Sequence, residues 1–181
     1  YPPPAGMPGL RQVLASRHGE GGGAVAADQI AVTAGAKGGL LALLAALLEP
    51  GDELTPPLPC SPAYPAMARR LGARPVAVAE AGGSFAGWTQ AVAERIGPRT
   101  RAVVVASPSN PTGATLSGAQ ASELVALCRG RGLRLICDEA YGEFRFAPGT
   151  GALPADFDPE RRTVVQLRSA SKSWALCGWR V

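Results

Sequence analysis

Residues 101–141 read "RAVVVASPSNPTGATLSGAQASELVALCRGRGLRLICDEAY", and this stretch decides the fold. Arg101 to Pro108 and Leu133 to Tyr141 hold short apolar runs with β-branched residues, which are typical of buried strands. Between them, Ser117 is a residue type that begins helices, and a helical pattern follows it to about Arg129. A strand, a helix and a second strand in this order predict a right-handed crossover within a parallel sheet.

The same alternation extends on both sides of this stretch. Gln29 to Gly35 is expected to form a short strand, and "GLLALLAALLEPGD" then predicts a buried helix that Pro50 and Gly51 stop. Arg162 to Ser169 is expected to be the last strand, and "DELTPP" and "RPVAVA" predict weaker ones. The sequence therefore predicts an α/β fold, with a mostly parallel sheet flanked by helices, as one domain over residues 1–181.

Composition excludes several other classes of protein. With 46% hydrophobic and 18% charged residues, the chain is typical of a globular protein. No apolar run approaches the roughly 20 residues of a membrane span, and no signal peptide is recognised, so we expect a cytoplasmic protein without a membrane partner. The net charge of +4 comes from scattered arginines without interleaved aromatic residues, which argues against nucleic-acid binding.

Metal binding is not expected either. The four cysteines lie too far apart for a CxxC motif, and the chain has a single histidine, His18. Free, buried thiols are the expected state of the cysteines.

Four short motifs follow expected strands, and in open α/β sheets ligands bind beyond the carboxyl ends of the strands. The first is "TAGAKGG" (Thr33 to Gly39), whose small residues let the backbone approach a phosphate at the start of a helix. The second is "SPSNPTG", in which two prolines fix the loop around the Asn110 amide, a hydrogen-bond donor for a ligand. Each motif is also compatible with an ordinary tight turn.

The third motif, "CDEAY", places Asp138 near the rim of the sheet and Tyr141 three residues later. A carboxylate in that position needs a cationic partner, and the protonated ring nitrogen of a cofactor is one candidate. The alternative is a surface Asp-Glu pair that caps a helix.

The fourth motif is the stretch "SASKSWALCGWRV" (Ser169 to Val181). It contains Lys172, one of only two lysines in the chain, between Ser171 and another serine, with Arg180 eight residues later. A desolvated lysine amine is a nucleophile, and the planar guanidinium of arginine suits a phosphate. A plain surface role for Ser-x-Ser-Lys explains this motif equally well when it is taken alone.

Together these motifs resemble the class I and II aminotransferases, the fold type I enzymes that depend on pyridoxal 5'-phosphate (PLP). The resemblance runs from "YPPPAGMPGLRQVLA" through "PGDEL", "SPSNPTG" and "DEAY" to "SASKSWALCGWRV". It implies the large domain of these enzymes, an α/β/α sandwich. It also implies that the chain stops before the closing strand and the small domain, which carries the arginine that binds the substrate carboxylate. On that basis the 181-residue chain alone is expected to be inactive.

The resemblance also implies roles for individual residues. Lys172 would form the Schiff base with PLP, Asp138 would hold the ring nitrogen protonated, and Asn110 and Tyr141 would bind the ring hydroxyl. Tyr1 would reach the phosphate of a neighbouring subunit, which implies a homodimer. The residues implied to bind the phosphate within the subunit are Gly35, Ala36, Lys37, Ser169, Ser171 and Arg180.

The implied reaction is the transfer of an amino group between an amino acid and a 2-oxo acid. A carbon-sulfur lyase, a synthase, a decarboxylase, a PLP-sensing regulatory domain and a degenerate copy that binds nothing are the alternatives. One departure bears on them, because the family usually stacks an aromatic residue on the cofactor ring where this chain has Ser61. Tyr64 is not an obvious replacement.

Overall fold

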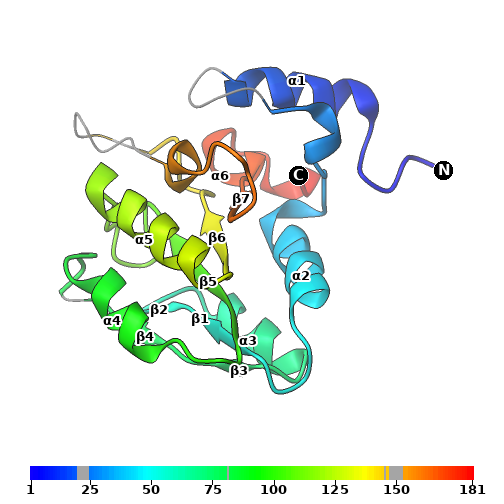
Figure 1. Ribbon diagram of the computed structural model, residues 1–181. Helices are drawn as coiled ribbons and strands as arrows, with labels where there is room; N and C mark the ends of the chain where they lie inside the picture. The colour runs from blue at the N-terminus through cyan, green and yellow to red at the C-terminus, as the bar shows by residue number, and fades with distance from the viewer. Residues whose placement is uncertain (20–24, 81, 145, 147–152) are drawn as a thin grey trace.

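The computed structural model describes residues 1–19, 25–80, 82–144, 146 and 153–181. Five strands form one sheet in the order β3-β1-β5-β6-β7, and every neighbouring pair is parallel (Figure 1). Two further strands, β2 (Pro57–Leu58) and β4 (Val78–Ala79), pair with each other in parallel. The strands of the larger sheet are β1 (Glu53–Thr55), β3 (Arg74–Pro75), β5 (Thr100–Ala106), β6 (Arg134–Asp138) and β7 (Val164–Leu167).

The register of the central strands fixes where the loops leave the sheet. Ala106 at the end of β5 is paired with Asp138 at the end of β6, and Asp138 is paired in turn with Leu167 at the end of β7. Three carboxyl ends therefore lie level at one edge. The loops that follow them carry three of the four sequence motifs.

Helices cover both faces of the sheet. Helices α4 (Trp88–Arg95) and α5 (Gly118–Gly130) lie on one face, and α2 (Gly35–Leu47) and α3 (Ala63–Arg70) on the other (Figure 1). Because side chains alternate along a strand, β5 contributes Val103 and Val105 to the core under α4 and α5. It contributes Ala102 and Val104 to the core under α2 and α3.

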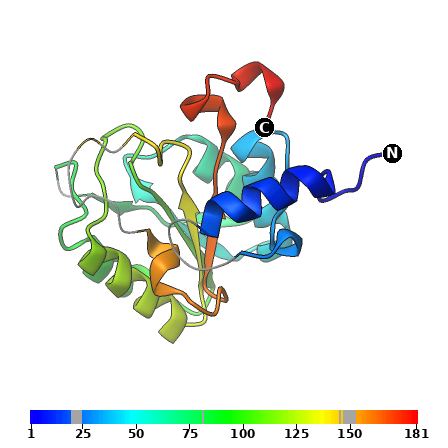
Figure 2. The same ribbon diagram turned by 90° about the horizontal axis from the view of Figure 1, so that it is seen from above.

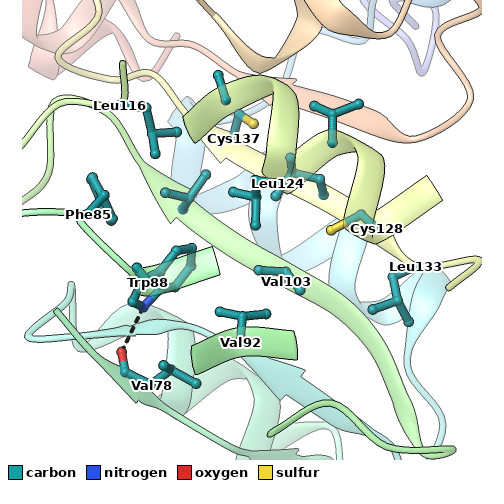
Figure 3. Close-up of a cluster of buried hydrophobic side chains, with 14 residues drawn as sticks. Val78, Phe85, Trp88, Val92, Val103, Leu116, Leu124, Cys128, Leu133 and Cys137 are labelled. Atoms are coloured by element: carbon teal, nitrogen blue, oxygen red, sulfur yellow. Dashed lines mark hydrogen bonds between the residues drawn. The ribbon is translucent and has the colours of Figure 1, made fainter. Parts of the chain in front are cut away.

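The core under α4 and α5 contains the largest buried side chain. Trp88 packs edge-on against Phe85, with 5.4 Å between ring centroids. Its indole Nε1 donates a hydrogen bond of 3.0 Å to the carbonyl oxygen of Val78, so burial leaves no polar atom of the ring unpaired (Figure 3). This bond ties α4 to β4.

The crossover helix α5 confirms the prediction from Ser117. The Ser117 hydroxyl accepts a hydrogen bond from the Gln120 amide at 3.2 Å, and the Gln120 side chain accepts one from the Ser117 amide at 2.8 Å. The two groups thus satisfy each other's unpaired donors, as a capping box does. The expected strands on both sides of this helix are β5 and β6, and the weaker expected strands are β1, β3 and β4.

One expected strand is wrong. Gln29 to Gly35 forms no strand: residues Ala27–Gln29 are a 3-10 helix, and residues 30–34 belong to no helix or strand. The reason is that its backbone partner is a loop, since the Val32 amide donates to the carbonyl of Ala5 at 2.9 Å. The helix expected after it begins at Gly35 and ends at Leu47, before Pro50.

The remaining helices lie outside the two helical layers or in the loops that connect the strands. Helix α1 (Pro8–Gly19) lies outside the two helical layers, and the Arg17 guanidinium lies 4.9 Å from the ring centroid of Trp174, just after α6 (Ala170–Ser173) (Figures 1 and 2). Two short 3-10 helices cover Pro154–Phe157 and Cys177–Trp179. Within the described residues, no helix has the length and apolar character needed to cross a membrane.

Candidate functional site

The candidate site lies at the carboxyl edge of the sheet, where four segments meet. Asp138 ends β6, the loop of residues 107–113 follows β5, and residues 169–180 follow β7. The fourth segment is the start of α2, which lies beside the C-terminal residues in both views (Figures 1 and 2).

Asp138 is held by two donors. The Tyr64 hydroxyl donates to its Oδ2 at 2.7 Å, and the Ala140 amide donates to its Oδ1 at 3.0 Å. In the described part of the chain, no lysine or arginine forms an ion pair with Asp138. The half-buried carboxylate is thus oriented but still able to pair with a cationic ligand.

Tyr64 is a site residue that the sequence did not reveal. It is 2% exposed in α3, and burial, followed by the charge of Asp138, raises its pKa well above the ordinary range. The hydroxyl therefore stays protonated and donates at any physiological pH. Sequence reasoning considered Tyr64 only for ring stacking, and nothing in the pattern links it to Asp138, 74 residues later.

Ser61, the departure from the family pattern, has a local role in the structure. Its hydroxyl accepts a hydrogen bond of 3.4 Å from the Ala63 amide, at the start of α3. It thereby helps begin the helix that carries Tyr64.

The start of α2 and the C-terminal segment meet at Gly35 and Arg180, where they leave donors for an anion. Gly35 begins α2 with a backbone φ of +69°, and a Cβ at this position would lie only 2.7 Å from Nη2 of Arg180. Arg180 donates to the carbonyl oxygens of Ala34 at 3.4 Å and Cys177 at 2.9 Å. No carboxylate pairs with it among the residues described. A guanidinium beside the positive end of a 13-residue helix suits a phosphate.

Lys172 lies in the short helix α6, and its neighbours come from that helix and from the segment after β6. The Ser169 hydroxyl accepts a hydrogen bond from the Ser171 amide at 3.1 Å and caps this short helix. Lys172 is exposed, and its Nζ lies 5.8 Å from the centroid of the Tyr141 ring. The structure therefore brings Lys172 and Tyr141, from the ends of neighbouring strands, to the same place.

Three other expected residues lie at the surface of the site or away from it. Asn110 is exposed in its loop, and Lys37 is exposed in the first turn of α2, next to the half-buried Ala36. Tyr1 is fully exposed at the end of the N-terminal segment, which extends away from the rest of the chain (Figures 1 and 2). That Tyr1 reaches a neighbouring subunit stays a prediction.

Three kinds of group follow the carboxyl edge of the sheet: the Arg180 guanidinium at the start of α2, the exposed Lys172 amine, and the oriented Asp138 carboxylate, which has no basic partner in the described ranges. The described residues contain no group of three or more histidine, cysteine or acidic side chains that could hold a metal ion. A guanidinium, an amine and a carboxylate are groups that can contact the phosphate, the carbonyl and the cationic centre of an organic ligand.

Comparison with known proteins gives a consistent result. The family model for aminotransferase class I and II matches residues 1–181. The arginine–pyruvate transaminase AruH of Pseudomonas aeruginosa is 41% identical over 97% of this chain and 45% of its own length. The aspartate/prephenate aminotransferase of Thermus thermophilus is 37% identical over all of this chain and 47% of its own.

Solved structures agree in fold. Aspartate aminotransferase from Thermus thermophilus with maleate superposes with a TM-score of 0.92 at 35% identity, over 99% of this chain and 47% of that one. N-succinyldiaminopimelate aminotransferase from Mycobacterium tuberculosis gives 0.93 at 30% identity, over 99% and 48%. The chain thus spans about half the length of the relatives it matches.

Proposed function

Because the chain belongs to the class I and II aminotransferases, we propose that it forms the PLP-binding part of a transaminase that moves an amino group from an amino acid to a 2-oxo acid. Enzymes of this family depend on PLP. The observation that carries the proposal is the position of Arg180 against Gly35, because it joins a phosphate cradle to the segment that contains Lys172.

The residues present fit PLP. The close approach of Arg180 leaves no room for a side chain at position 35, as a cradle for a phosphate requires. Asp138, held by Tyr64, would face the ring nitrogen, and the Asn110 amide and the Tyr141 hydroxyl would donate to the ring hydroxyl. The remaining phosphate contacts would come from Ala36, Lys37, Ser169 and Ser171.

Lys172 and Asp138 would then have different roles in the reaction. When bound, PLP supplies an aldehyde carbon that condenses with amines and a ring that accepts the charge of a carbanion. Lys172 would hold the cofactor and, once its amine is released, would take the proton from the α-carbon of the substrate. Asp138 would keep the ring nitrogen positively charged, an interaction that matters most when negative charge develops.

Substrates and assembly are proposed at the level of class. The two relatives named above are called arginine–pyruvate and aspartate/prephenate aminotransferases, which supports an amino acid and a 2-oxo acid as the substrate pair. We further propose a cytoplasmic homodimer in which Tyr1 reaches the phosphate of the neighbouring subunit.

Reductive labelling tests the proposal. The protein expressed from its complete reading frame is mixed with PLP and reduced with borohydride, and its peptides are mapped by mass spectrometry. We expect a pyridoxyl group on Lys172 and none on Lys37, which provides the internal control as the second lysine of this chain. Lys172→Ala should remove the label and abolish turnover.

Two results would contradict the assignment. A label on Lys37 would move the reactive amine to α2, and the absence of any label in the described peptides would remove the basis for PLP chemistry. The amino donor is then identified by pairing each amino acid with pyruvate and measuring the alanine formed.

A further inference from the structure

Glu80 is a buried carboxylate outside the site described above. It follows β4 and is 8% exposed. Its Oε1 accepts a hydrogen bond of 3.1 Å from the Ser109 hydroxyl, and its Oε2 accepts one of 3.0 Å from the Thr112 hydroxyl. Both oxygens of this carboxylate thus accept hydrogen bonds from the loop after β5.

The two donors flank Asn110. Ser109 comes immediately before it and Thr112 two residues after it. The loop also closes on itself, because the Ser109 amide donates to the carbonyl of Ala114 at 2.8 Å and the Gly113 amide donates to that of Ser109 at 2.8 Å. Glu80 therefore fixes a preformed turn at two points on either side of the Asn110 side chain.

Fold stability alone does not explain this arrangement. In the residues that the structure describes, no basic side chain forms an ion pair with Glu80, so two hydroxyls hold a buried carboxylate. Burying a charge without a counter-charge is costly, and two apolar groups of similar shape would fill the same space without that cost. The hydrogen bonds do give the loop a single orientation, which an apolar contact does not.

Glu80 also interacts with the segment that precedes α3, the helix that carries Tyr64. Burial, and after it the charge of Glu80, raises the pKa of the Cys60 thiol, and Cys60 precedes Ser61 in the chain. The backbone amide of Glu80 also donates to the carbonyl of Leu58 at 2.8 Å. Glu80 therefore connects the segment that leads into α3 with the loop that carries Asn110.

We propose that Glu80 is a positioning residue, which holds the loop of residues 107–113 so that the Asn110 amide donates to the ring hydroxyl of PLP. The proposal rests on the proposed function, because it assumes that PLP occupies the site. It assigns Glu80 a role in how the cofactor is bound, although Glu80 itself does not touch it.

The test compares variants of the protein from its complete reading frame by two readouts other than turnover. These are the apparent Kd for PLP from absorbance titration and the pH midpoint of the visible absorbance change of the bound cofactor. A donor to the ring hydroxyl favours its ionised form, so its loss should move the midpoint to higher pH. We expect Glu80→Ala to move the midpoint upward and to weaken PLP binding about 3- to 10-fold, as the loss of one hydrogen bond does.

Further variants separate positioning from folding. Glu80→Gln keeps the shape and one acceptor oxygen, so it should restore most of the wild-type midpoint. Ser109→Ala and Thr112→Val each remove one of the two bonds and should give smaller shifts in the same direction, even if Glu80→Ala does not fold. Asp158→Ala is the matched control, because Asp158 is another buried carboxylate that accepts hydrogen bonds, here from the Thr163 and Val164 amides at the start of β7.

The decisive comparison is a double-mutant cycle with Asn110→Ala. If Glu80 acts through Asn110, Glu80→Ala shifts the midpoint in the wild-type background and adds nothing in the Asn110→Ala background. Full additivity, or a Glu80→Ala protein that melts earlier but keeps the wild-type midpoint and PLP affinity, overturns the proposal. A wild-type protein that binds no PLP overturns the proposed function as well, so the two failures are distinguishable.

Discussion

Gly35 has a left-handed backbone conformation and lies against the side chain of Arg180. Its φ of +69° favours glycine, and Arg180 occupies the space where a Cβ would lie. We expect Gly35→Ala to lower stability by about 1 kcal/mol through its backbone and to weaken PLP binding because it displaces Arg180. Absorbance titration with PLP measures the second effect.

Gly132 provides the matched control for that prediction. It has a φ of +66° and nothing within 4 Å of a Cβ position, so Gly132→Ala carries the same backbone cost without touching Arg180. Equal losses of PLP affinity in both variants would show that the effect is one of folding alone.

Tyr64 supports Asp138 through a single hydroxyl. Tyr64→Phe keeps the buried ring but removes the 2.7 Å hydrogen bond, so the carboxylate keeps the Ala140 amide as its remaining described donor. Because hydrogen bonds to charged groups contribute about 1.5–3 kcal/mol, we expect turnover at saturating PLP to fall at least about tenfold. Steady-state kinetics checks this, and unchanged turnover would mean that Asp138 needs no such support.

For single residues, the sequence indicated candidate site residues by their type but did not indicate the side chains that hydrogen-bond to them. Lys172, Asp138 and Arg180 were singled out as candidates because lysine, aspartate and arginine are chemically distinctive and occur in motifs that follow predicted strands. Tyr64 and Glu80 were not, because their roles depend on contacts with residues 74 and about 30 positions away. Such contacts exist only after the sheet has formed.

At the scale of elements, Asp158 fixes the start of β7. Its Oδ2 accepts hydrogen bonds of 2.8 Å from the amides of Thr163 and Val164, and Arg129 of α5 pairs with its Oδ1 at 3.1 Å. Burial alone would raise the pKa of Asp158, but these amides and Arg129 outweigh it and lower the pKa. One carboxylate thereby joins the crossover helix to the edge strand.

This lowered pKa predicts a dependence of stability on pH. The unfolded state binds the proton more tightly than the folded state, so the stabilisation is fully present above the unfolded pKa of about 3.9. It is lost as the pH falls through the lower, folded value. In urea titrations between pH 6 and pH 3, Asp158→Asn should therefore lose less free energy of unfolding than the wild type does. An identical pH profile would exclude Asp158 as a contributor.

The predictability of elements follows from where their backbone partners lie. β5, β6 and α5 were predicted because their patterns are local: apolar β-branched runs, and a serine followed by a helical pattern. The false strand at residues 29–35 has an equally apolar pattern, but its partner is the loop at Ala5. A hydrophobic pattern indicates burial, and it does not say whether a neighbouring strand exists.

At the scale of the whole molecule, the sheet separates two cores. Leu124 of α5 is fully buried in one, and Leu44 of α2 is fully buried in the other. We expect Leu124→Ala and Leu44→Ala each to cost about 2–5 kcal/mol in the free energy of unfolding. Because they share no packing partners across the sheet, their sum should match the double variant within about 0.5 kcal/mol in urea titrations. A large deviation would indicate that the sheet transmits strain.

The contact between Arg180 and the start of α2 also sets the time at which the site can form during translation. The two halves of the phosphate cradle are 145 residues apart in the chain, and ribosomes add about 5–20 residues per second. Some 7 to 30 s therefore pass between the synthesis of Gly35 and that of Arg180. On the proposed function, ribosome-bound chains stalled before Arg180 should bind PLP more weakly than released chains do, because they lack the guanidinium that would contact the phosphate.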